Sequence, residues 1–493
     1  MPESSEPSLP SFDELFVVSD LHLGGDEGFQ IFKESERLGS FCEALAAHEP
    51  HKRVGLVLAG DILDSLPFLP PGTYLAPDPA ALVHRIARLF APVFDGLRRF
   101  VGKPRRELWI LTGNHDVELA LPEGQDALLE LLCASEAARG RVRFRVNGTG
   151  LRCRVGERTV LVTHGNEADS WNQVDYESLR QVAHARALGQ IDAQDHFRAN
   201  PGTRLVIDAM NAVKRDHPFV DLLKPETEAC LKVLMALYPG ELVGRIPSGA
   251  RAFAAKWRQP PFVLGAETAR TPDAAPDVLS EALGRLARPA RADAEDLERR
   301  VDRYHADDVD PLTLVSDEGA TLGLGGFFAD QATGASRAVA LRDALISWLG
   351  DERHWRFDDR DEVCREVLDH VGPGVDVVVT GHTHLARHFV EPGRLVYVNT
   401  GTWARLIRLC VADLNRAAEP ELETLLRALE SRDMATLDTS QFGGTGALAQ
   451  TRSHAAHVTS ELAELLLVAD GGAWKVEQDD DGNTLSAFFA SLA

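Results

Sequence analysis

Short apolar runs recur along the first third of the chain, and polar residues follow each of them. The runs have the length of buried strands and cover residues 16–20, 54–61, 108–116 and 159–165. Between them, residues 36–48 and 81–100 carry apolar side chains near helical spacing. This alternation of strands and helices predicts a layered α/β fold whose sheet contains parallel strand pairs.

A different pattern begins after residue 170 and lasts until the next strong apolar run, at residues 375–384. The intervening residues 171–374 are rich in Ala, Arg and Asp and show helical spacing in places, so we expect a mainly helical insertion or cap. The expected plan is a polar tail at residues 1–12, a main domain in two parts at 13–170 and 375–406, and a C-terminal extension of unassigned role at 407–493. Within the extension, residues 473–489 suggest a hairpin with an Asp-Gly turn.

Charge and cysteine usage narrow the class of protein. The 52 Lys and Arg residues face 75 Asp and Glu residues, a formal net charge of -23. This charge repels a phosphate backbone, so general nucleic-acid binding is disfavoured. The six cysteines are scattered without a CxxC pair, which predicts free thiols in a reducing compartment. Since the sequence shows neither a signal-peptide pattern nor 18 uninterrupted apolar residues, we expect a cytoplasmic protein without a transmembrane segment.

Asp, Asn and His residues gather where the predicted strands end. The motifs are Asp20-Leu21-His22, Gly60-Asp61 with Asp64, Gly113-Asn114-His115-Asp116, His164-Gly165 and Gly381-His382-Thr383-His384. Loops at the carboxyl ends of strands converge in layered α/β proteins. Carboxylate, amide and imidazole groups without thiolates suit divalent metals such as manganese, iron, zinc or nickel. A bridging Asp would hold two such cations roughly 3.5 to 4 Å apart.

In this order, the motifs DLH, GDxxD, GNHD, THG and GHTH resemble those of the calcineurin-like metallophosphoesterase family, over about residues 14–170 and 372–406. The resemblance implies a metal-dependent hydrolase built as a four-layer α/β/β/α sandwich. Our own hypothesis is that the insertion forms a cap that restricts substrate access. The resemblance also implies two divalent metal ions as cofactors, among which we favour manganese.

The resemblance implies a role for each matching residue. Seven side chains match metal ligands: Asp20, His22 and His384 on one ion, Asn114, His164 and His382 on the other, and Asp61 between them. His115 matches the histidine that assists the leaving group, and we expect Asp116 to orient His115 or a ligand. The implied reaction is attack by a metal-bridging hydroxide on a phosphomonoester, phosphodiester or diphosphate of a small substrate.

Several alternatives stay open. Asp64, Asn166 and His388 are weaker candidates for substrate contacts. The SDLHLGG opening is similar to the UDP-2,3-diacylglucosamine hydrolase branch, although that branch generally carries Arg where this sequence has His115. The sequence therefore leaves open a UDP-sugar-lipid pyrophosphohydrolase, a DNA nuclease, against which the acidic charge counts, and a non-catalytic scaffold with the same fold.

Overall fold

The computed structural model describes the chain on both sides of one long central segment. The described residues are 9–190, 192–224, 336–350, 355–391, 395–443 and 447–492, with residues 233, 237 and 393 in addition. Contacts divide the chain into two compact units: Met1–Asp208, Arg353–Arg405 and Thr451–Ala493 form the first, and Ala209–Glu352 and Leu406–Gln450 form the second. Within the described ranges, no helix combines the length and apolar character needed to cross a membrane.

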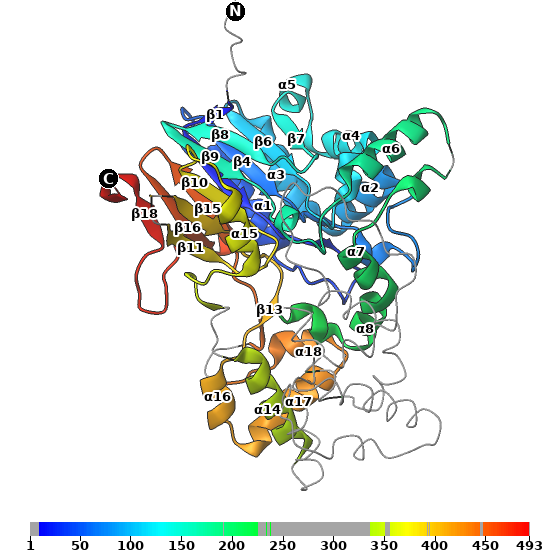
Figure 1. Cartoon of the computed structure of the whole chain (residues 1–493), viewed down its shortest axis with the longest axis vertical. Helices are drawn as coiled ribbons and strands as arrows, with labels where there is room; N and C mark the ends of the chain where they lie inside the picture. Colours follow the sequence, from blue (N-terminus) through cyan, green and yellow to red (C-terminus); the bar gives the residue numbers. More distant parts are fainter. Residues whose placement is uncertain are drawn as a thin grey trace, which may run out of the picture. The chain divides into compact units, whose positions relative to one another are not determined.

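An eight-stranded mixed sheet forms one half of the first unit (Figure 1). Its order is β17 (Trp474–Val476), β16 (Leu462–Val468), β15 (His454–Thr459), β2 (Glu14–Val18), β4 (Val54–Ala59), β6 (Arg106–Leu111) and β7 (Val142–Arg145), and β18 (Ser486–Phe488) also pairs with β16. Strands β2, β4, β6 and β7 pair in parallel, whereas β15 joins β2 in antiparallel fashion. Every residue of β2 and β4 is buried, as is typical of parallel strands covered on both faces.

A six-stranded sheet packs against the first sheet. Its order is β1 (Ser11–Phe12), β8 (Leu151–Val155), β9 (Arg158–Val162), β10 (Val377–Thr380), β12 (Val396–Asn399) and β11 (Arg387–Val390). An apolar core between the sheets combines Val17 and Trp109 with Val160 and Val379. Strand β10 pairs in parallel with β9 and β12, so the second part of the main domain completes this sheet.

Helices cover the outer face of each sheet. The helices α1 (Ser35–Ala47), α2 (Pro79–Leu89), α3 (Ala91–Gly102) and α4 (Pro122–Leu132) share a core with the eight-stranded sheet. Helix α15 (Glu362–His370) packs Cys364 against Val378 and Tyr397 of the six-stranded sheet. Local sequence sets the start of α2, because Asp78 accepts a hydrogen bond from the Ala81 N–H and Pro79 begins the helix. The predicted α/β/β/α layering is confirmed.

Shorter elements surround the strand ends. The strands β3 (Leu23–Gly24) and β5 (Leu63–Asp64) pair in parallel, and a Cβ on Gly24 would lie 2.3 Å from the Asp64 carbonyl oxygen, so this close approach requires glycine. The remaining helices of the first unit are α5 (Glu136–Arg139), α6 (Tyr176–Ala187) and α7 (Pro201–Leu205), and a π-helical turn follows at Val206–Met210.

The described part of the second unit is mainly helical. It contains α8 (Asn211–Asp216), α14 (Arg337–Leu349), α16 (Val411–Arg416), α17 (Glu419–Glu430) and α18 (Met434–Thr439), with a small sheet of β13 (Leu406–Ile407) and β14 (Ala449–Gln450). Helix α14 packs against both α16 and α17. Most of the expected insertion between residues 225 and 335 lies outside the described residues.

The division into units differs from the expected domain plan at three places. Helices α6 and α7 belong to the first unit, although we expected the insertion to begin at residue 171. The extension at 407–493 splits, because residues up to Gln450 join the helical unit and the rest supply strands β15 to β18. Strand β1 pairs with β8 and so includes the end of the expected polar tail, of which residues 1–8 lie outside the described residues.

Candidate metal centre

The sequence-predicted metal ligands follow the carboxyl ends of five strands. Asp20 and His22 follow β2, Asp61 follows β4, Asn114 follows β6, His164 follows β9, and His382 and His384 follow β10. Backbone hydrogen bonds join these loops, since the Asp20 N–H donates to the Gly60 carbonyl and the Gly381 N–H donates to the His164 carbonyl. Loops from both sheets therefore meet at one edge of the sandwich.

Five of these residues have a left-handed backbone: Asp20 (φ 51°), His22 (φ 49°), Asp61 (φ 51°), His382 (φ 69°) and His384 (φ 62°). They are five of the eight non-glycine residues with positive φ in the described part of the chain. Such a conformation costs on the order of 1 to 3 kcal/mol per residue and concentrates at functional sites. The strain therefore marks the same loops as the sequence motifs.

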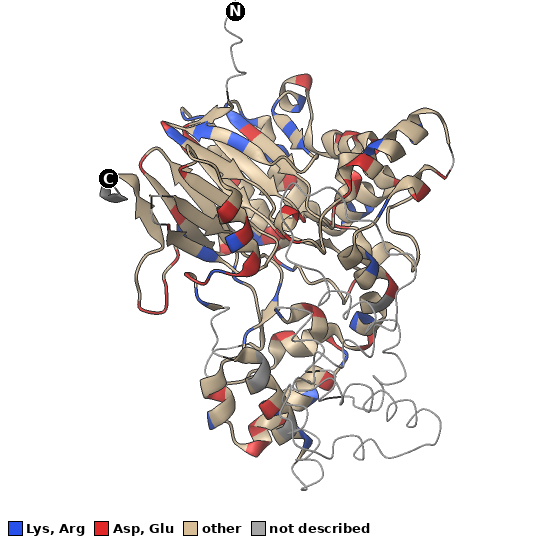
Figure 2. Ribbon diagram, in the orientation of Figure 1, with Lys and Arg blue, Asp and Glu red and all other residues tan. Residues whose placement is uncertain are grey.

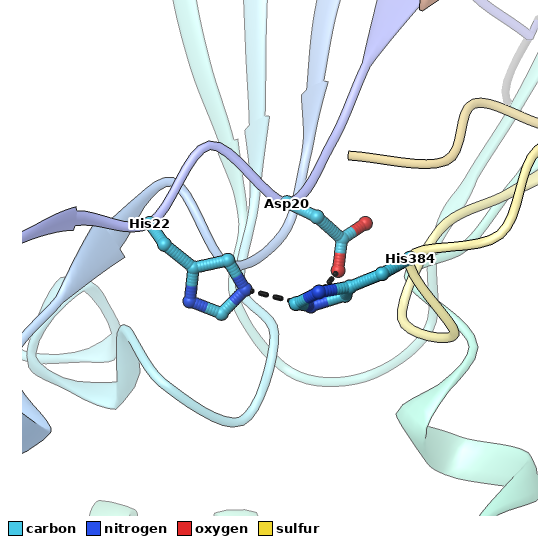
Figure 3. Close-up of side chains that lie close together, drawn as sticks. All are labelled: Asp20, His22 and His384. Atoms are coloured by element: carbon cyan, nitrogen blue, oxygen red, sulfur yellow. Dashed lines mark hydrogen bonds and ion pairs between the residues drawn. The ribbon is translucent and has the colours of Figure 1, made fainter. Parts of the chain in front are cut away.

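Asp20, His22 and His384 form the first group of side chains that can hold a metal (Figure 3). Their ligand atoms lie within 4.8 Å of one another, and all three residues are buried. Nε2 of His22 lies 2.9 Å from Nε2 of His384, and Oδ1 of Asp20 lies 3.4 Å from the same His384 nitrogen. Two imidazoles that turn lone pairs towards each other repel, and a cation between them removes that repulsion. The group fits a metal ion.

Asp61, His164 and His382 form a second group of the same kind. Oδ2 of Asp61 lies 3.2 Å from Nε2 of His164 and 3.9 Å from Nε2 of His22. The Asp61 carboxylate thus lies between the two groups, and His22, Asp61 and His115 make a third combination with the same spacing limit. The arrangement resembles a two-metal site with one shared carboxylate.

The GNHD turn adds an amide oxygen to this edge. Oδ1 of Asn114 is buried and has no hydrogen-bond partner among the described residues. An unsatisfied buried acceptor costs about 1 to 3 kcal/mol, which a bound cation would offset. A Cβ on Gly113 would lie 2.1 Å from Oδ1 of Asp61 and 2.7 Å from Nε2 of His164, so the turn runs directly against the second group. Only glycine allows this approach.

The electrostatics of the centre favour positive charge. Burial raises the pKa of Asp61, but His164, His115 and His22 together hold it well below its usual range. Burial lowers the pKa of His164, yet the carboxylates of Asp61 and Asp20 raise it to about 10. The lowered pKa of Asp61 reports the positive charge of the imidazoles around it, whereas the raised pKa of His164 reports the negative potential of the two carboxylates. A divalent cation would satisfy that potential without protonating the imidazole.

Residues 14–221 match the family model of the calcineurin-like phosphoesterases. This match supports the calcineurin-like phosphoesterase superfamily for this part of the chain. A search of curated proteins finds no match. The family is one of metal-dependent phosphoester hydrolases, and the side-chain groups of this phosphoesterase suit divalent metals. His382 and His384 lie beyond the matched residues, and their place beside Asp20 and Asp61 comes from the structure.

Asp64, which we expected only as a weak substrate contact, bonds two imidazoles of the phosphoesterase. Its Oδ1 lies 3.0 Å from Nδ1 of His115, and its Oδ2 lies 3.3 Å from Nδ1 of His22. Burial raises its pKa, but the two histidines hold the pKa well below its usual range. Carboxylates in this position fix the tautomer and orientation of an imidazole. The spacing of GDxxD was the sequence signal for this residue.

Asp116, which we expected to orient His115 or a ligand, bonds two backbone groups of neighbouring loops. Its carboxylate accepts hydrogen bonds from the backbone N–H groups of Gly113, at 2.7 Å, and Ile62, at 2.8 Å. Burial, followed by the charge of Asp61, raises the pKa of Asp116 to about 7. Asp116 therefore ties the GNHD turn to the GDxxD loop, while Asp64 contacts the His115 ring.

The other two weak candidates differ in their surroundings. Asn166 is fully buried in the loop after His164, and its Nδ2 donates to the Asn172 carbonyl at 3.0 Å. His388 lies on β11, where its Nε2 donates to the Ala463 carbonyl at 3.1 Å. Burial lowers the pKa of His388, so its ring is a neutral part of the sheet packing.

Proposed function

We propose that this phosphoesterase hydrolyses a small phosphorylated substrate at a centre of two divalent cations. The observation that carries this proposal is the place of Asp61 between the two groups: its Oδ2 lies 3.2 Å from Nε2 of His164 in the second group and 3.9 Å from Nε2 of His22 in the first. One cation would bind to Asp20, His22 and His384, the other to Asn114, His164 and His382, with Asp61 between them. We expect manganese as the metal at this centre, and we expect the protein to be cytoplasmic.

When bound, the two cations supply Lewis acidity that polarises phosphoryl oxygens and makes a water molecule more acidic. The protein residues hold the substrate and move a proton. His115 has Nδ1 against the Asp64 carboxylate, which orients the ring. Its side chain is 18% exposed, so it can reach substrate more readily than His22, which is 2% exposed. We assign to His115 the donation of a proton to the leaving oxygen.

The test is hydrolysis of bis-(p-nitrophenyl) phosphate and p-nitrophenyl phosphate by metal-stripped protein refilled with manganese. We expect activity only with a divalent cation, and a loss of at least about 100-fold in Asp61→Asn, because the shared carboxylate would lose its charge. Asp95→Asn, on the exposed face of α3, is the control and should retain activity. Inactivity of the refilled protein on both substrates and on a nucleotide panel would favour the non-catalytic scaffold.

A second candidate, a phosphodiesterase of nucleic acid, is favoured by one feature. Residues 139–158 contain seven arginines and one glutamate. Four of these arginines are exposed on the strands β7 and β8, namely Arg143, Arg145, Arg152 and Arg154. Among the described residues these four form no ion pair, and their contacts are with backbone carbonyl groups and the Trp109 ring. Figure 2 shows Lys and Arg positions gathered around these strands.

The two candidates differ in how salt affects them. Each phosphate contact by an arginine makes polyanion binding more sensitive to salt. A nuclease should therefore bind single-stranded DNA less tightly at high salt. The double variant Arg143→Gln with Arg145→Gln should make the logarithm of the binding constant fall less steeply with the logarithm of the salt concentration. If the protein binds neither DNA nor RNA at low salt, the four arginines do not bind a nucleic-acid substrate. The small-substrate proposal then stands.

A further inference from the structure

Asp169 contacts a histidine of the second metal group from a loop that the family motifs do not include. Its Oδ2 lies 3.1 Å from Nε2 of His382. Asn172 Nδ2 donates to the same oxygen at 2.7 Å, and the Trp171 N–H donates to Oδ1 at 2.9 Å. Both oxygens are therefore held, so the carboxylate faces the imidazole in one orientation.

This contact selects one tautomer of His382. A neutral imidazole has one N–H group, and a carboxylate is an acceptor, so the proton lies on Nε2. The lone pair is then on Nδ1, which is the atom left for a cation. His164 shows the same pattern with the nitrogens exchanged, because its Nδ1 donates to the Ala59 carbonyl at 2.8 Å and Nε2 faces Asp61.

The loop that carries Asp169 also holds the N-terminus of α7. The carbonyl of Asn172 accepts from Nδ2 of Asn200 at 3.4 Å, and the Gly202 N–H donates to the Trp171 carbonyl at 2.9 Å. Asn200 in turn caps α7, because its Oδ1 accepts from the Thr203 N–H at 2.7 Å. A Cβ on Gly202 would lie 2.1 Å from Oδ1 of Asn172, so the two segments are in tight contact.

We propose that Asp169 is a positioning residue for the second metal, which fixes the tautomer of His382 and links that histidine to the N-terminus of α7. The proposal rests on the proposed role of His382 as a ligand. Residues that contact a ligating histidine from outside typically change metal affinity about 10- to 100-fold when they are removed. Removal of the Asp169 carboxylate should therefore weaken the binding of the second cation and leave the affinity for the first unchanged.

The experiment is a titration of the metal-free full chain with cobalt, followed by absorption and by calorimetry. The wild type should bind two ions, whereas Asp169→Ala should bind the first normally and the second about 10- to 100-fold more weakly. Asp195→Asn, an exposed carboxylate on the turn Ala193–His196, is the control and should match the wild type. Circular dichroism of the metal-free proteins verifies that each variant is folded.

A second variant keeps the test decisive if Asp169→Ala does not fold. Asn172→Ala leaves Asp169 and His382 in place but removes one hydrogen bond that holds the carboxylate. Asn172→Ala should weaken the binding of the second ion by a smaller factor than Asp169→Ala does. If each folded variant binds the second ion as tightly as the wild type does, Asp169 has no positioning role and the proposal is wrong. A wild type that binds no cation would instead overturn the two-metal proposal.

Discussion

Replacement of Asp64 by Asn should weaken the hydrogen bonds of this carboxylate to two histidines, one expected to donate a proton and one expected to bind metal. Asp64 bonds Nδ1 of His115 and Nδ1 of His22, and it is buried. Asn keeps the size and one acceptor but loses the charge. The loss of a charge-assisted hydrogen bond costs about 1.5 to 3 kcal/mol. At about 1.4 kcal/mol for each factor of ten, the expected decrease in kcat is roughly 10- to 100-fold.

The assay compares two phosphodiesters, one with a p-nitrophenol leaving group and one with a simple alcohol. Protonation by His115 matters little for the activated phenol and much for the alcohol, so Asp64→Asn and His115→Ala should both be more damaging with the alcohol. The contact with His22 adds a second effect, a weaker affinity for metal, which His115→Ala should not share. If Asp64→Asn lowers kcat equally for both leaving groups at saturating metal, our account of the Asp64 and His115 pair is wrong.

Three further predictions concern stability and the metal site. Glu14 is buried and accepts hydrogen bonds from His48 and His457, which hold its pKa below the usual range against the effect of burial. We expect Glu14→Gln to lower the free energy of unfolding by about 3 kcal/mol near pH 6 in denaturant melts, as for broken buried pairs. Chelation should lower the melting temperature, because a cation at 1,000 times its Kd stabilises by about 4 kcal/mol. Gly60→Ala should lower activity more than 10-fold in the p-nitrophenyl assay, because its Cβ would lie 2.5 Å from Cγ of His164.

The pH profile of the Glu14 cluster has a definite sign. The pKa of Glu14 is lowered on folding, so its contribution to stability is present above about pH 4.5 and is lost as the pH falls. Burial lowers the pKa of His457, but its hydrogen bonds to Glu14 and Glu464 raise it overall, so its contribution is present below about pH 6.5 and is lost as the pH rises through the raised pKa. A stability profile of Glu14→Gln with the same shape as that of the wild type would contradict this account.

Two controls match these variants. Glu107→Gln breaks the exposed ion pair with Arg53 and should change the free energy of unfolding by less than about 1 kcal/mol. Gly72 has φ 82°, close to the 88° of Gly60, but no atom lies within 4 Å of a Cβ there. Gly72→Ala therefore carries the backbone strain without the contact with the His164 ring. Equal loss of activity in the two glycine variants would show that the contact is irrelevant.

The parallel strands and their polar ends could be predicted because the signal is local. The run at 54–61 contains both the buried strand β4 and the Asp61 that follows it. The hairpin expected at residues 473–489 also has a local turn signal, and Gln478 pairs there with Thr484 in an antiparallel bridge. Strand β15 could not be predicted in this way. His454–Thr459 becomes a strand through its pairing with Leu15 and Val17 on β2, more than four hundred residues away in the sequence. Such pairing depends on tertiary contacts, which outweigh weak local preferences.

The partner of His115 shows how far side-chain contacts can be predicted from the sequence. Asp116 is adjacent in sequence, and adjacency favoured it as the orienting residue. The turn directs the Asp116 carboxylate to the N–H groups of Gly113 and Ile62, and Asp64 reaches the ring from another loop. The direction of a side chain after a tight turn depends on backbone angles, which the order of residues does not reveal.

The left-handed backbone at the predicted ligands has a consequence for engineering. Glycine adopts positive φ without strain, so Asp20→Gly or His384→Gly would relieve a cost that the native residue carries. A library screened only for heat resistance in a chelating buffer would then enrich such changes and lose the centre. Directed evolution of this protein should select for retained metal at every round, because thermostability alone favours removal of its ligands.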